Sequence, residues 1–88
     1  MNKERFELND PRNVICKHGQ FDVLIQFAWE EGDEVPTASH LSVSRLEAGA
    51  HAEIGPIRRE WSSYDHAVEH VKGYAKLFAD AMSKQKQL

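Results

Sequence analysis

Three side chains with the chemistry of a metal site lie within one short string, His66-Ala67-Val68-Glu69-His70. A spacing of four places His66 and His70 on one face of a helix, where two imidazoles can bind the same Zn²⁺ ion. Glu69 lies between them in the chain, and its carboxylate can act as a general base toward a zinc-bound water. The string therefore raises the hypothesis of a metal-binding or metal-dependent hydrolytic protein.

This string, H-x-x-E-H, resembles the zinc-binding signature of the inverzincin metalloproteases. The resemblance covers the string alone, and it implies His66 and His70 as zinc ligands and Glu69 as the base. The third ligand of that family is an acid far downstream, whereas Asp80 is the one acid that follows His70 here. The competing interpretation is that both histidines are surface residues at the edge of an apolar helix stripe.

A second group of polar side chains falls on one face of two predicted strands. Its members are His40, Ser42, Ser44, His51 and Glu53. A serine, a histidine and an acid on adjacent strands are the residue types of a catalytic triad. A flat strand face offers neither an oxyanion hole nor a pocket, so we interpret the group as a candidate surface on the solvated side of the sheet.

Three further features have both a structural and a functional interpretation. The acids of residues 30–34 could hold a divalent cation, but their spacing does not match an EF-hand. Arg58 and Arg59 followed by Trp61 could contact a nucleic acid, although Trp61 is better interpreted as an anchor under a helix. Cys16 falls on an apolar strand face, where a thiol is inert.

The elements that position these residues follow from their apolar periods. Residues 21–30 alternate apolar and polar side chains, which predicts a long strand with one buried face. Residues 14–17 are predicted to pair with it about a two-residue turn at His18-Gly19, so that Cys16 faces Phe21. This register puts the apolar residues of both strands on one side.

A second hairpin is predicted to join residues 40–46 to residues 50–57 about Ala48-Gly49. Pairing across this turn places Leu41 and its apolar neighbours on one side and the polar group on the other. Pro56 has no N–H to donate to a ladder, so the last strand is expected at an edge of the sheet.

The C-terminal part of the chain is predicted to be a helix. Ser62, with Asp65 three residues later, suggests its N-cap, and the apolar spacing extends to about Ser83. Its predicted stripe consists of Val68, Val71, Ala75, Phe78 and Met82. The predicted core consists of Val23, Ile25, Phe27, Val71 and Phe78.

Together these elements predict one small α+β domain over residues 1–88. It has two layers, a four-stranded antiparallel, meander-like sheet with one C-terminal helix packed on one face. Residues 1–12 are expected to form a flexible arm or a short edge strand, and residues 84–88 a frayed tail. One helix about 10 Å wide cannot cover four strands about 4.8 Å apart. We therefore expect a homodimer, or another protein partner, to cover the remaining apolar surface.

The composition limits the function further. A net charge of −3 over 88 residues disfavours binding to nucleic acid or to an anionic membrane. The chain has one cysteine, no apolar leader in its first ten residues and no apolar run of membrane-spanning length, so we expect a cytoplasmic protein. The favoured hypothesis is a small, self-associating interaction protein without enzymatic activity or cofactor. A zinc protein and a nucleic-acid-associated regulator are the alternatives.

Overall fold

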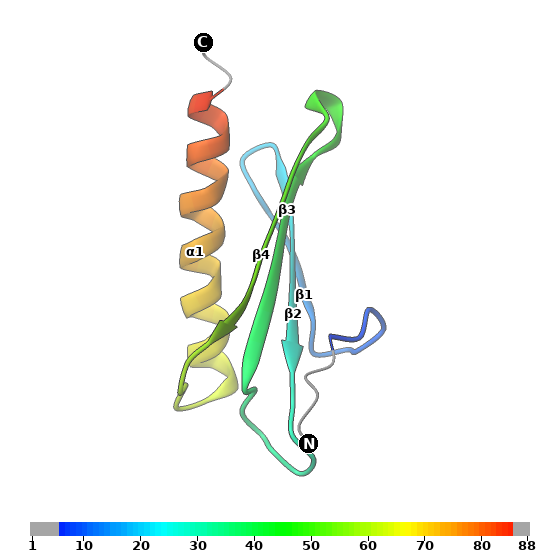
Figure 1. Ribbon diagram of the computed structural model, residues 1–88, viewed down its shortest axis with the longest axis vertical. Coiled ribbons are helices and arrows are strands. Elements are labelled where there is room, and N and C mark those ends of the chain that lie inside the picture. Colours follow the sequence, from blue (N-terminus) through cyan, green and yellow to red (C-terminus); the bar gives the residue numbers. More distant parts are fainter. Residues whose placement is uncertain (1–5, 86–88) are drawn as a thin grey trace.

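The computed structural model describes residues 6–85 and has two layers, a sheet and a helix (Figure 1). Its elements are β1 (Val14–His18), β2 (Phe21–Ala28), β3 (Ala38–Arg45), the short 3-10 helix η1 (Leu46–Ala48), β4 (Ala50–Arg58) and α1 (Tyr64–Gln85). The strands form one antiparallel sheet in the order β1-β2-β3-β4, and α1 lies across one face. The predicted α+β fold is therefore confirmed. We call the face toward α1 the inner face and the opposite one the outer face.

The turn between β1 and β2 lies one residue later than predicted, at Gly19-Gln20. His18 pairs with Phe21, so Cys16 does not. Gly19 has a φ of 62°, a left-handed conformation that glycine adopts without a steric penalty. Because the move shifts the strand pairing by two residues, every side chain keeps its predicted face.

The hairpin of β3 and β4 has the predicted faces, with Leu41 opposite Ile54 on the inner side. β4 occupies a sheet edge, as Pro56 indicated. The pairing is irregular between Ser39 and Leu41, where Gly55 lies on the opposite strand with a φ of 137°. A Cβ atom at Gly55 would lie 3.0 Å from the carbonyl oxygen of Ser39, so this position requires glycine.

The start of α1 differs by one residue from the prediction, because Ser63 rather than Ser62 is the N-cap. The Oγ atom of Ser63 accepts the backbone N–H of His66 at 3.0 Å. In return, the Nδ1 atom of His66 accepts the backbone N–H of Ser62 at 3.1 Å. His66, and not Asp65 as predicted, thus reaches back toward the N-cap as the acid of a capping box does, but it accepts the N–H of the residue before the N-cap.

Bulky side chains from the sheet side and small ones from the helix fill the interior. Phe21, Phe27 and Trp61 are buried between the layers. The buried residues of α1 are Ala67, Val71, Ala75 and Ala79. The prediction that Val23, Ile25, Phe27 and Val71 belong to the core is confirmed, whereas the prediction for Phe78 is wrong, since it is 37% exposed. With aromatic rings already between the layers, α1 packs through its smallest residues and carries Phe78 on its flank.

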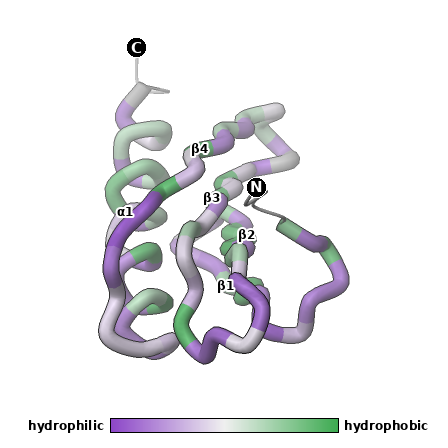
Figure 2. The backbone as a smooth tube through the Cα atoms, turned by 60° about the horizontal axis from the view of Figure 1, so that its bottom comes forward, coloured by the Kyte–Doolittle hydropathy of each residue, from purple (hydrophilic) through white to green (hydrophobic). Residues whose placement is uncertain are grey.

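The segment before β1 lies on the side of the sheet opposite α1 (Figures 1 and 2). The ring of Phe6 lies 5.8 Å from the ring of His40, and the Phe6 carbonyl accepts a hydrogen bond from the side chain of Gln26. Residues 6–12 form turns and no strand. Residues 1–5 of the predicted arm and 86–88 of the predicted tail lie outside the described residues.

The same segment is fixed at the end of the sheet near the start of α1. The guanidinium of Arg12 lies 4.0 Å from the centroid of the Trp29 ring, which is a cation–π contact. The hydroxyl of Tyr64 donates to the Arg12 carbonyl at 2.6 Å, and its ring stacks on Trp29. Three hydrogen bonds from Arg12, two of its side chain and one of its backbone, lower the pKa of Asp10.

Candidate functional site

The two histidines of the H-x-x-E-H string are neighbours on α1, with ring centroids 6.3 Å apart. The Nδ1 atom of His70 accepts the indole N–H of Trp61 at 2.9 Å, and that of His66 accepts a backbone N–H. An indole or amide N–H can only donate, so both Nδ1 atoms act as acceptors. A neutral ring then carries its proton on Nε2. Both side chains therefore stabilise the beginning of the helix.

These hydrogen bonds conflict with a zinc site at the string. A histidine that binds zinc through Nε2 carries its proton on Nδ1, where it would meet the N–H of Trp61 or Ser62. Binding through Nδ1 would break the same two hydrogen bonds. Within residues 6–85, no three histidine, cysteine, aspartate or glutamate side chains are grouped so that they could hold a metal ion.

We therefore predict that dialysed protein binds Zn²⁺ only weakly. In a calorimetric titration the expected dissociation constant lies above roughly 10 µM, since two imidazoles without a third ligand make an incomplete site. His66→Ala should remove this residual binding, while His51→Ala, on the outer face, should leave it unchanged. Stoichiometric binding below about 1 µM, or hydrolysis that a chelator stops, would contradict the prediction.

The outer face brings together three of the five polar residues singled out in the sequence. Glu53 lies between two imidazoles, with its Oε1 3.2 Å from Nε2 of His40 and its Oε2 3.0 Å from Nε2 of His51. The hydrogen bond from His51 lowers the pKa of Glu53, and the charges of His40 and His51 act in the same direction. The arrangement is a carboxylate shared by two histidines on an exposed surface.

The two serines of this group do not join it. Ser42 lies opposite Glu53 in the strand register, and Ser44 lies opposite His51. Among the described residues, neither of these two serines is hydrogen-bonded to an imidazole, so neither hydroxyl is aligned for activation as a nucleophile. The geometry supports polar contacts of Glu53 with one imidazole on β3 and one on β4, and no triad.

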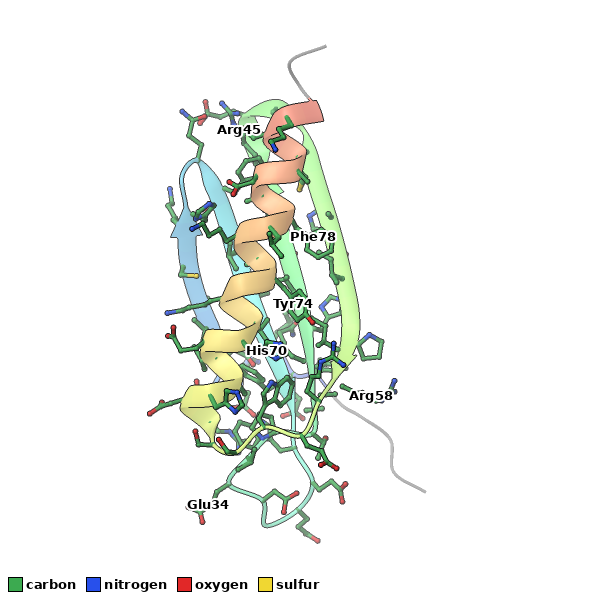
Figure 3. The ribbon with its side chains drawn as sticks, turned by 90° about the vertical axis from the view of Figure 1, so that its left-hand side faces the viewer. Glu34, Arg45, Arg58, His70, Tyr74 and Phe78 are labelled. Carbon is green, nitrogen blue, oxygen red and sulfur yellow. The ribbon has the colours of Figure 1, made fainter. Side chains whose placement is uncertain are left out.

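Of three further candidates from the sequence, the acidic loop lies in solvent, and Cys16 and Trp61 pack against the core. The loop that holds the acids projects beyond one end of the sheet, where Glu34 points into solvent (Figure 3). Cys16 packs against the core on the inner side, as predicted. Trp61 is the predicted anchor, buried edge-on against Phe27.

No helix in the described part of the chain combines the length and apolarity needed to cross a lipid bilayer.

An apolar groove between α1 and β4 was not found by the sequence analysis. Its volume is about 570 Å³, and we call it the α1–β4 groove. It is lined by Ile54, Pro56, Ile57, Arg58, Arg59, Tyr74, Leu77, Phe78 and Ala81. Figure 3 shows Tyr74 and Phe78 on the flank of α1 that faces β4, with Arg58 near the end of that strand. Positions 74, 77, 78 and 81 follow the i, i+3, i+4, i+7 spacing of a second apolar stripe, a signal that the sequence contained.

The groove is apolar along its length and cationic at one end. Arg59 donates from Nη2 to the hydroxyl of Tyr74 at 3.1 Å, which holds its guanidinium beside the groove. Arg58 lies next to it in the chain. The described lining contains these two cations and no carboxylate.

Comparisons of this chain with protein-family models, curated proteins and solved structures find no match.

Proposed function

We propose that this chain is a small protein-interaction module that acts without catalysis in the cytoplasm and binds a partner through the α1–β4 groove. The observation that carries the proposal is the second apolar stripe of α1, whose middle residues are exposed to solvent. Leu77 is 66% exposed and Phe78 37% exposed, side by side on the wall of the groove. Contiguous apolar surface of this kind is typical of interaction sites.

The other hypotheses have less support in the geometry. A zinc hydrolase needs imidazole nitrogens that already accept hydrogen bonds from Trp61 and Ser62. A nucleic-acid-binding site needs a broad cationic surface, whereas Arg58 and Arg59 border an apolar groove on a chain of net charge −3.

A photo-crosslinking side chain in place of Leu77 tests the proposal in cells. Because position 77 lies on the groove wall, irradiation is expected to give one discrete adduct heavier than the 10.1 kDa chain. The same side chain at position 15, an exposed aliphatic site on the outer face, is the matched control and should not give that adduct. Phe78→Asp combined with the probe at position 77 should abolish it, because a carboxylate in the groove opposes apolar docking.

Two results would contradict the proposal. One is the absence of any adduct from position 77 when the protein is folded, as judged by circular dichroism. The other is an adduct that persists unchanged in Phe78→Asp, since the partner would then contact α1 outside the groove.

Self-association is a second candidate, and a different surface favours it. Ile15 is 82% exposed on the outer face and pairs across the strands with Leu24. Two aliphatic side chains make a small patch, well below the roughly 800 Å² per partner of a standard interface. The homodimer that we propose is therefore a weak one.

Sedimentation equilibrium at micromolar to millimolar concentrations tests self-association by measuring the mass of the protein in solution. The wild-type mass is expected to rise above 10.1 kDa with concentration, and Ile15→Asp should return it to one chain. Leu77→Asp is the control and should associate like the wild type. A constant mass of one chain would reject self-association and leave the groove proposal standing, whereas loss of the dimer in Leu77→Asp alone would move the dimer contact to the groove.

A further inference from the structure

The position of α1 leaves room for one more helix on the inner face. α1 packs closest to β1, β2 and β3, and β4 forms the uncovered margin of the sheet beside it. A helix is about 10 Å wide, close to the width of two strands. In Figure 3 the helix runs along the sheet with β4 exposed at its side. A second helix laid next to α1 would complete the helical layer over β4.

The edge of β4 is poorly suited to binding an added strand at this place. Pro56 lies in the part of β4 that forms the groove and has no N–H for a ladder. Gly55, immediately before it, lies where the pairing with β3 is irregular. An occupant that satisfies its own backbone hydrogen bonds avoids both problems, and a helix does so.

The charges of the groove indicate the chemistry of such a helix. The groove walls offer aliphatic and aromatic side chains, and Arg58 and Arg59 form one end. The bond between Arg59 and Tyr74 keeps this positive charge beside the apolar wall. A complementary ligand is apolar along one face and acidic near one end.

We propose that the α1–β4 groove binds an amphipathic helix of another protein, with apolar side chains against Phe78 and Leu77 and acidic side chains at Arg58 and Arg59. The lining of α1 from Tyr74 to Ala81 spans about two helical turns, so two turns of the ligand make the contact. This proposal rests on the proposed function and adds the secondary structure and the charge of the partner.

A second copy of this chain does not fit the same description. The one α-helix of the described residues is α1, whose primary apolar face is buried against its own sheet. A second copy bound with the last turn of α1 at this end of the groove would bring Lys84 against Arg58 and Arg59 with like charge. Bound the other way round, it would have to offer the stripe that already forms the wall of its own groove.

The test uses two synthetic peptides of about 15 residues, the length at which isolated helices become marginally stable. Both have leucines at i, i+3, i+4 and i+7 spacing, and they differ in carrying glutamates or lysines in the last turn. Fluorescence anisotropy measures affinity, and backbone amide shifts in NMR locate binding. Wild-type protein is expected to bind the glutamate peptide about tenfold more tightly than the lysine peptide, with shifts at residues 54–59 and 74–81.

Charge reversal supplies the matched controls. Arg58→Glu with Arg59→Glu should reverse the preference, so that the lysine peptide binds more tightly, a gain that misfolding cannot produce. Lys72→Glu with Lys76→Glu changes the net charge equally on the opposite flank of α1, near Cys16, and should keep the wild-type preference. Added salt should reduce the difference in affinity between the two peptides, because it screens the charges of Arg58 and Arg59.

Three outcomes of the peptide experiment would overturn the proposal. These are equal binding of both peptides, binding of neither peptide, and amide shifts confined to the outer face. Each leaves the proposed function testable on its own, because the adduct from position 77 reports contact at the groove whatever the structure or charge of the partner. A cellular adduct of twice the mass of this chain would assign the groove to a second copy and also overturn the proposal.

Discussion

Replacing Phe27 with alanine is expected to lower the free energy of unfolding by about 3–5 kcal/mol. Phe27 is 1% exposed, and its ring makes edge contacts with Trp29, Trp61 and Tyr64. The substitution therefore removes a large buried ring and leaves a cavity between the sheet, the start of the helix and the segment that joins β4 to α1. A domain of this size has a total stability of only about 5–10 kcal/mol, so the variant should be partly unfolded at 37 °C.

Urea unfolding followed by circular dichroism measures this loss, with Ile15→Ala as the control. Ile15 is an aliphatic residue of the same sheet that faces solvent, so its substitution should change the stability by less than about 0.5 kcal/mol. A loss below about 1 kcal/mol for Phe27→Ala would mean that this strand face is solvated, which contradicts the fold described here.

Replacing Trp61 with alanine is expected to lower the free energy of unfolding by a similar amount, about 3–5 kcal/mol. Trp61 precedes the first turn of α1, is buried, and donates its indole N–H to His70. Its removal opens a cavity under the helix and leaves the Nδ1 atom of His70 without its donor. Thermal unfolding by calorimetry measures the combined loss.

Trp61→Phe separates the two contributions. Phenylalanine retains most of the buried ring and lacks the N–H, so this variant should lose about 1–2 kcal/mol, and His70→Ala should lose no more than a similar amount. If the hydrogen bond is the shared cause, the double variant should be less destabilised than the sum of the singles. Full additivity would show that the bond between Trp61 and His70 contributes nothing to stability.

The faces of the strand side chains could be predicted because they depend on a period of two, and the meander order could be predicted because it needs the fewest long connections. An error of one residue in the turn at Gly19 moved the pairing by two and left the faces intact. The rotation of α1 could not be predicted in the same way. Two apolar stripes share the helix, and the choice between them depended on volume that the rings of Phe27 and Trp61 already occupy. Periodicity along one element contains no information about the volume of its neighbour.

In the candidate site, too, contacts within one element could be predicted from the sequence, whereas contacts between elements could not. Spacing correctly placed His66 beside His70, because a helix brings residues four apart together. It could not reveal that Trp61, nine residues earlier than His70, donates to the imidazole and takes the nitrogen that zinc chemistry would need free. Predicting the contact of His40 and His51 with Glu53 would have required the register of two strands. Predicting the groove would have required the position of α1 on the sheet.

The order of elements along the chain has a consequence for synthesis on the ribosome. All four strands precede α1, so the meander can emerge and pair while its inner face, with Ile25 and Phe27, has no cover. At the usual elongation rates of roughly 5–20 residues per second, the 22 residues of α1 take roughly one to four seconds to follow. During this interval the nascent sheet exposes an apolar surface of the kind that chaperones bind. A delay in the arrival of α1 would lengthen the exposure without changing a single contact of the finished protein.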